Sequence, residues 1–138
     1  MNKNIRQLIA RYETQGDFTR PKNACASVRE AEAYLGQTLP KQYADFIEEY
    51  GHGGIGGVEV LGIGCNGELV FVEETLECRK YGLPSQYVVI ENCDEWIYCI
   101  DCVDESVVVW QQNEPVSSVF SSFDEYLLER FNEAIENI

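Results

Sequence analysis

The 138-residue sequence contains a single histidine, His52. A serine or cysteine nucleophile in a hydrolase normally needs a histidine base that a third group holds in place. The sequence also lacks the G-x-S-x-G motif of serine hydrolases. Adjacent acid pairs are present, but neighbouring residues of a strand point to opposite faces, which separates their carboxylates. We therefore expect that this protein is not an enzyme.

Basic residues are scarce, and they are almost absent from the second part of the chain. Residues 1–80 carry twelve acidic and nine basic residues, whereas residues 81–138 carry twelve acidic residues and one base, Arg130. A formal net charge of −14 repels nucleic-acid phosphates and anionic lipids, so we expect neither nucleic-acid nor membrane binding. The same field attracts cationic proteins. Acidity that merely keeps the protein soluble is the alternative.

Long apolar runs are missing as well. No window approaches the roughly 18 consecutive apolar residues of a membrane span. Met1–Glu13 mixes three basic residues with scattered apolar ones, unlike the continuous apolar core of a secretory signal. We therefore expect a cytoplasmic protein. The composition, 45% hydrophobic and 12% aromatic with four prolines, is typical of a folded chain, and we predict a single domain over residues 1–138.

Six cysteines are present, and Cys99 and Cys102 have the C-x-x-C spacing of metal and redox sites. Zinc needs four ligands that converge on one point. Cys99 falls in a predicted strand, where a rise of about 3.3 Å per residue would hold it almost 20 Å from Cys93. We expect no metal and no cofactor, and we expect these cysteines to be small buried side chains or surface thiols. A metal-dependent enzyme or sensor stays open as an alternative.

The segment Gly51–Gly57 contains five glycines. Phosphate-binding loops follow a strand and precede a helix, whose N-terminus then faces the phosphate. Here the glycines follow a predicted helix and precede the strand-like Val58–Leu61. We therefore expect a flexible corner between helix and sheet.

Apolar periodicity and capping residues predict five helices. Ile5, Leu8, Ile9 and Tyr12 share one helical face. Ser27 with Glu30, and Ser122 with Glu125, have the spacing of capping boxes. The predicted helices are Ile5–Tyr12, Ser27–Leu35, Pro40–Tyr50, Glu73–Tyr81 and Ser122–Ile138.

Strand-like runs separated by turn residues fill the rest of the chain. Asn66-Gly67 is a strong hairpin signal between the first two runs. Short turns between the later runs indicate an antiparallel meander. We predict an α+β fold: a mostly antiparallel sheet of about five to six strands, with N-terminal and C-terminal helices packed against it. The predicted strands are Val58–Ile63, Glu68–Val72, Gln86–Ile90, Trp96–Asp101, Ser106–Gln111 and Val116–Phe120.

The stretch Leu35–Gly54 resembles the signature of the SUKH superfamily, the Smi/Knr-like proteins. The resemblance lies in Leu39-Pro40 before a helix, aromatic and aliphatic positions along that helix, and a glycine-bearing corner after it. Tyr98–Asp101 and Ser122–Leu127 are looser matches, so the similarity spans about residues 25–136. The resemblance implies the same α+β fold.

The resemblance also implies a class of function. Most bacterial members look like immunity proteins that neutralise a cognate polymorphic toxin by binding it, whereas fungal members act as regulatory scaffolds. Our expectation is an immunity protein that occludes a cationic, nuclease-type toxin domain. A non-catalytic regulatory or scaffold domain is the alternative. The family supplies no catalytic or binding residues that could be assigned to positions of this chain.

The charge pattern, rather than the resemblance, suggests where a basic toxin would bind. Acids in turns and connectors would steer it, and exposed aromatic side chains would anchor it. For each residue the alternative is a solvated acid or a core tryptophan. The predicted contacts are Glu73, Glu74, Asp94, Glu95, Trp96, Asp104, Glu105, Trp110 and Glu114.

Overall fold

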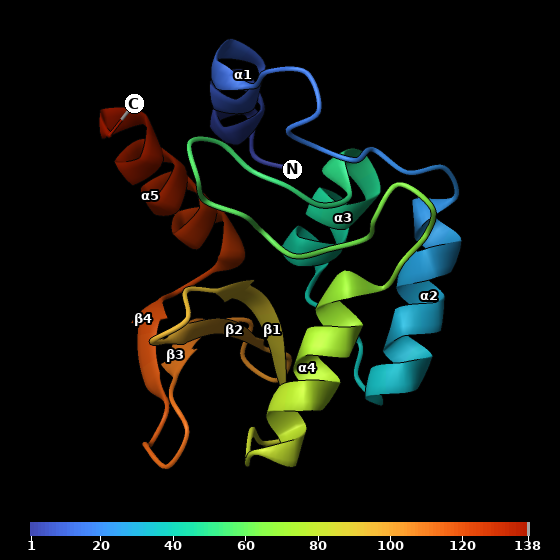
Figure 1. Ribbon diagram of the computed structural model, residues 1–138, viewed down its shortest axis with the longest axis vertical. Coiled ribbons are helices and arrows are strands. Elements are labelled where there is room, and N and C mark those ends of the chain that lie inside the picture. The colour runs from blue at the N-terminus through green and yellow to red at the C-terminus, as the bar shows by residue number, and fades with distance from the viewer. Residues whose placement is uncertain (138) are drawn as a thin grey trace.

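The computed structural model describes residues 1–137, which fold into five helices and one four-stranded sheet (Figure 1). The sheet is an antiparallel meander in the order β1-β2-β3-β4. The helices are α1 (Lys3–Tyr12), α2 (Ala24–Leu35), α3 (Lys41–Tyr50), α4 (Val70–Lys80) and α5 (Phe123–Glu136). The strands are β1 (Tyr87–Asn92), β2 (Ile97–Asp101), β3 (Val107–Trp110) and β4 (Ser117–Phe120).

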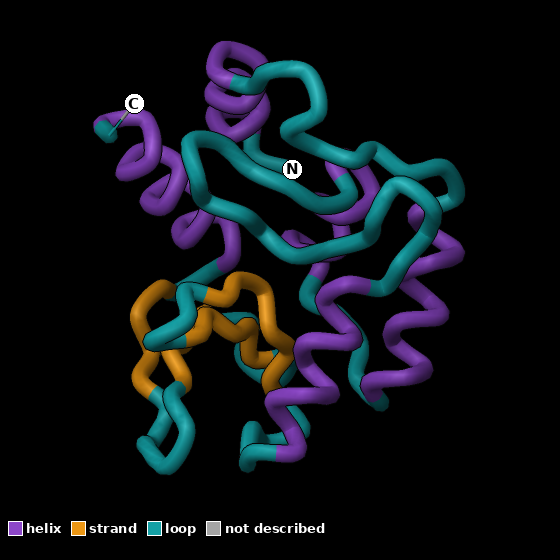
Figure 2. Tube along the Cα trace, viewed as in Figure 1, coloured by secondary structure: helices purple, strands orange, loops and turns teal. Residues whose placement is uncertain are grey.

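The helices gather on one side of the sheet, and a long loop crosses between them (Figure 2). α4 runs beside β1, and α5 leads away from β4 toward α1 (Figure 1). The buried hydroxyl of Thr75 on α4 accepts a hydrogen bond from the backbone N–H of Val89, at 2.9 Å. The N–H of Leu61, in the long loop, donates to the carbonyl of Ile90, at 2.8 Å. The outer edge of β1 is thus bonded to other parts of the chain.

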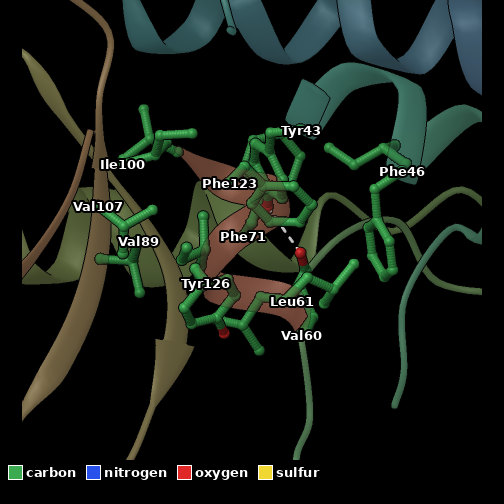
Figure 3. Close-up of a cluster of buried hydrophobic side chains, with 14 of the residues drawn as sticks. Tyr43, Phe46, Val60, Leu61, Phe71, Val89, Ile100, Val107, Phe123 and Tyr126 are labelled. Carbon is green, nitrogen blue, oxygen red and sulfur yellow. Dashed lines mark hydrogen bonds between the residues drawn. The ribbon is translucent and has the colours of Figure 1, made fainter. Parts of the chain in front are cut away.

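The core lies where α3, α5 and α4 meet the sheet (Figure 3). The Tyr43 ring packs edge-to-face against that of Phe71 and at a tilt against that of Phe123, with ring centroids 5.5 and 5.2 Å apart. Its buried hydroxyl donates to the carbonyl oxygen of Leu61 at 2.6 Å, so the polar end of this side chain is satisfied. The same aromatic group continues through Phe123 to Tyr126, at 5.6 Å.

The predicted helix ends are partly confirmed. α3 begins directly after Pro40, and the Ser122 hydroxyl caps α5 by accepting from the N–H of Glu125 at 3.2 Å. α2, however, begins at Ala24, so Ser27 lies inside the helix and is not its cap. Ile138, predicted on the apolar side of the last helix, lies outside the described residues.

The prediction of five to six strands is wrong, although the α+β class is confirmed. Val70–Val72 belongs to α4 rather than to a strand. Phe71, Thr75 and Cys78 are buried at helical spacing, and this packing decides the conformation of a short apolar run that fits either structure. Residues 58–63 form isolated bridges instead of a strand, at Val60 and Ile63.

The glycine-rich corner is a tightly packed crossing of backbones. The N–H of Val60 donates to the carbonyl of Gly53 at 2.9 Å, and the reverse bond measures 3.1 Å. A Cβ at Gly62 would lie 1.7 Å from the carbonyl oxygen of Gly51, and one at Gly53 would lie 1.8 Å from that of Asp17. Glycine is required here because the backbones approach too closely for any side chain.

Candidate protein-binding surface

Two turns of the sheet lie side by side at one of its ends. Because successive strands are antiparallel, the β1–β2 turn and the β3–β4 loop share an end, and the β2–β3 turn lies at the other. The pairing of Ile97 with Trp110 brings the first two together. Three predicted contacts, Asp94, Glu95 and Glu114, are exposed in these turns.

Helix α4 adds acidic side chains beside the β1–β2 turn. Glu73 and Glu77 are exposed, one helical turn apart, and Glu74 is half-buried. The Glu74 Oε1 atom accepts a hydrogen bond of 2.7 Å from the side-chain amide of Asn92, the last residue of β1. This bond ties the helix to the turn. We call the resulting surface the acidic end; its members are Glu73, Glu74, Glu77, Asp94, Glu95 and Glu114.

A hollow of about 400 Å³ opens between α4 and the two turns. Its size falls within the range of roughly 300–1,000 Å³ for ligand pockets in proteins. Acidic side chains and amides stand among aromatic and aliphatic ones. We call it the acidic hollow; it is lined by Glu77, Cys78, Tyr81, Asp94, Glu95, Ile97, Trp110, Gln111 and Gln112.

The turn that forms one wall of the hollow is held by its own hydrogen bonds. Asp94 adopts the left-handed conformation, with φ of 64°, and its N–H donates to the side-chain oxygen of Asn92 at 2.8 Å. The N–H of Cys93 donates to the carbonyl of Trp96 at 3.0 Å. Asp94 and Glu95 are therefore presented by a fixed turn.

The two tryptophans differ from the expectation of exposed anchors. Trp110 is only 6% exposed, because it belongs to the core as well as to the lining of the hollow. Trp96 is half-buried beside Glu95. Neither tryptophan is among the large exposed apolar side chains, whereas Tyr81, the residue directly after α4, is 55% exposed.

Asp104 and Glu105 lie apart from the other predicted contacts, in the β2–β3 turn at the opposite end of the sheet. Asp104 Oδ1 accepts hydrogen bonds from the backbone N–H and the hydroxyl of Ser106, at 2.9 and 2.6 Å. These bonds lower the pKa of the Asp104 carboxyl. Asp104 thus stabilises a turn. Both acids border a separate hollow of about 190 Å³ next to Ser122.

Sequence reasoning missed six of the nine residues that line the acidic hollow: Glu77, Cys78, Tyr81, Ile97, Gln111 and Gln112. Glu77 was detectable, since it lies four residues after Glu73 and shares its helical face. Tyr81 directly follows α4 and Ile97 begins β2, and nothing in the local sequence of either residue indicates that they line the same hollow.

A buried ion pair joins α5 to β1, the strand that leads into the β1–β2 turn. The carboxylate of Glu91 on β1 receives two bonds from the Arg130 guanidinium of α5, at 2.6 and 2.9 Å. The hydroxyl of Tyr126 donates to the same carboxylate at 2.7 Å. The Arg130 guanidinium also lies 5.3 Å from the ring centroid of Tyr98. The network fastens α5 to the sheet one residue before the strand ends.

Cys99, Cys102 and His52 are engaged within the fold. Burial raises the pKa of the Cys102 thiol to about 12 and also raises that of Cys99, which keeps both thiols protonated near neutral pH. His52 accepts at Nδ1 from the N–H of Gly62, at 3.0 Å, and its Nε2 lies 3.2 Å from a carboxylate oxygen of Glu59. Within residues 1–137 no three histidine, cysteine or acidic side chains are grouped to hold a metal ion.

None of the helices in residues 1–137 combines the length and apolar character needed to cross a membrane.

Comparison with known proteins identifies a structure with the same fold and a matching family. A crystal structure of a protein from Pseudomonas syringae pv. tomato superposes with a TM-score of 0.74 at 19% sequence identity, over 96% of this chain and 99% of that one. At this identity the likeness establishes the shared fold. The model of the family described as SMI1-KNR4 cell-wall (SUKH_5) matches residues 1–132. The resemblance expected from the sequence is confirmed: the chain belongs to the SUKH-type, SMI1-KNR4 family.

Proposed function

We propose that this protein is an immunity protein that neutralises a cationic toxin by binding to it and covering its active site. The observation that carries the proposal is the acidic end, where acids from α4 and the β1–β2 turn line a hollow that aromatic side chains also line. The immunity role that the family resemblance implies gives this surface a use.

Binding proceeds in two physical stages. The excess of negative charge first steers a basic protein toward the acidic end, which raises its association rate. Side chains around the hollow then make the close contacts, with Tyr81 as the exposed aromatic residue. A toxin held in this way has its substrate path blocked without any chemical step.

A non-catalytic role is part of the proposal, and the reactive side chains support it. Both ring nitrogens of His52 are engaged within its loop, by Gly62 and Glu59. The thiols of Cys99 and Cys102 have raised pKa values, which removes the thiolate that a nucleophile or metal ligand needs.

The test is capture of the toxin-like product of an adjacent gene, paired with growth rescue when both proteins are expressed. We expect one-to-one capture, rescue, and an association rate that falls as salt rises. Neutralising the acidic end with E73Q, E74Q, D94N, E95Q and E114Q should slow association at least tenfold at low salt. The matched control is E105Q at the other end of the sheet, which should leave the rate unchanged.

Two results would contradict this proposal. A folded protein that neither captures the product nor rescues growth contradicts the immunity role and favours the scaffold alternative. Equal association rates for the acidic-end variants and E105Q would contradict electrostatic steering by this surface.

A further inference from the structure

We propose that the acidic hollow is a receptor for a single arginine side chain, presented by a loop of the partner protein. This inference deepens the proposed function and rests on it only for the identity of the protein that carries the arginine. The guanidinium would enter between α4 and the β1–β2 turn, with carboxylates on both sides.

Charge complementarity is the first argument. Glu77 stands on the helix wall of the hollow, and Asp94 and Glu95 stand on the turn wall. Lys80 lies 3.2 Å from Glu77 in an exposed pair whose side chains are 71% and 55% accessible. Such surface pairs contribute little, so an arriving cation can displace Lys80. The walls therefore offer carboxylates that no buried base neutralises.

The apolar lining selects the kind of cation. Tyr81, Trp110 and Ile97 line the same hollow as the acids. A guanidinium is planar and weakly hydrated, and it stacks on aromatic faces while its edge donates to carboxylates. A lysine ammonium is compact and strongly hydrated, so it loses more hydration on entering an aromatic-lined site. The combination of acids and aromatics at one place thus favours arginine over lysine.

The site is also organised before a partner arrives. The bond from Asn92 to Glu74 joins the two walls, and Asp94 is fixed by its own bond to Asn92. A preformed site loses less conformational entropy when a ligand binds. Gln111 and Gln112 complete the rim with amide oxygens that can accept further guanidinium N–H groups.

The direct test uses the full chain and a small probe, N-acetyl-arginine methylamide, in a ¹⁵N NMR titration. We expect millimolar binding, with shift changes confined to residues 77–81, 94–97 and 110–112. The lysine analogue should bind several-fold more weakly, and the neutral citrulline analogue should cause no saturable shifts. Shifts spread evenly over the acidic surface, or equal for arginine and citrulline, would overturn the proposal.

Variants of matched shape locate the site. The triple variant E77Q/D94N/E95Q should weaken binding of the arginine probe at least tenfold, and asparagine is tolerated at the left-handed position of residue 94. K80Q, which removes the competing base, should tighten binding two- to threefold. E105Q, at the opposite end of the sheet, should match the wild type. An unchanged triple variant, or a K80Q that binds more weakly, would contradict the assignment.

Toxin capture separates this inference from the proposed function. If the triple variant binds neither the arginine probe nor the toxin, both stand. If it captures the toxin as tightly as the wild type does, the arginine site is wrong and the immunity role remains. If the hollow binds the arginine probe but the wild type captures no toxin, the immunity role is wrong and the site remains.

Discussion

Replacing Arg130 with methionine should destabilise this protein more than most single substitutions would. In the ion pair, the Arg130 side chain is 15% exposed and that of Glu91 is 5% exposed. Methionine preserves most of the packing volume but removes the positive charge. The Glu91 carboxylate then stays buried, with the hydroxyl of Tyr126 and the thiol of Cys93 as its remaining polar neighbours.

The expected magnitude follows from this burial. Removing one partner of a buried ion pair typically costs about 3–5 kcal/mol, because the other charge is left uncompensated. The double variant E91Q/R130M should lose less than R130M alone, by about 1.5 kcal/mol or more, since a neutral amide can still accept from Tyr126. The matched control is E133Q, which removes the exposed partner of Arg130 and should cost under about 1 kcal/mol.

Urea unfolding followed by far-UV circular dichroism measures these differences, with m values compared to verify two-state behaviour. For a chain of this size the loss in R130M corresponds to a fall in melting temperature of roughly 10 °C or more. An R130M variant that loses less than about 1 kcal/mol would refute the reasoning. A double variant as unstable as the sum of both single variants would refute it too, since the two charges would then be uncoupled.

Three further predictions concern other parts of the fold. G62A should cost about 3 kcal/mol or more, because the new Cβ would lie 1.7 Å from the carbonyl oxygen of Gly51. The control is G36N, which lies in open space at a left-handed position that asparagine tolerates, and equal melting temperatures for the two variants would contradict this account. T75V should lower the free energy of unfolding in urea by about 1–3 kcal/mol, because it leaves the buried N–H of Val89 without an acceptor. A loss under about 0.5 kcal/mol, which is about a twofold change in the unfolding equilibrium, would contradict this role of Thr75. In thiol titration of the native protein near pH 8, Cys65 should react first, followed by Cys25, whose pKa is raised by its bond to Glu48. Buried Cys78, with a pKa of about 11, should react only on unfolding, and rapid modification of Cys78 would contradict the described packing.

The sequence predicted most helices and the meander because those segments carry strong local signals. The apolar spacing of α3 and α5 matches a helical face, and each begins at a recognisable residue, Pro40 or Ser122. The four strands β1 to β4 are short β-rich runs between polar turns, and all four were found within a residue or two.

The failures occur where tertiary packing decides. Val70–Val72 is a short apolar run, and periodicity alone cannot assign such a run to strand or helix. In the structure this run opens α4, where Phe71 and Thr75 are buried at helical spacing and the hydroxyl of Thr75 accepts from the N–H of Val89 on β1. Residues 58–63 have strand-like composition, but the close crossing at Gly53 and Gly62 leaves room only for isolated bridges.

For the candidate surface, too, local sequence signals could be predicted and tertiary contacts could not. Sequence reasoning identified the acidic turns, because acids between strands stand in exposed positions. It could not tell that antiparallel pairing would bring Asp94, Glu95 and Glu114 together and send Asp104 and Glu105 to the other end. Sequence reasoning could not predict the acidic hollow, since its aromatic and aliphatic lining comes from the end of α4 and from the separate strands β2 and β3.

The burial of Arg130 determines how much of the negative charge of residues 81–138 is neutralised. Arg130 is the one basic residue among residues 81–138, and it forms a buried ion pair with Glu91. Arg130 also lies 3.1 Å from the exposed carboxylate of Glu133, and the ten remaining acids of this segment have no basic residue of the same segment to pair with. The first part of the chain differs, since Arg6, Arg20 and Lys41 form ion pairs with acids close by. The single buried pair thus both secures α5 and leaves the negative field of the turns unneutralised. Adding a basic residue to the surface of this segment, as in Q112R at the rim of the acidic hollow, should slow association with a cationic partner. The free energy of unfolding should stay within about 0.5 kcal/mol of that of the wild type.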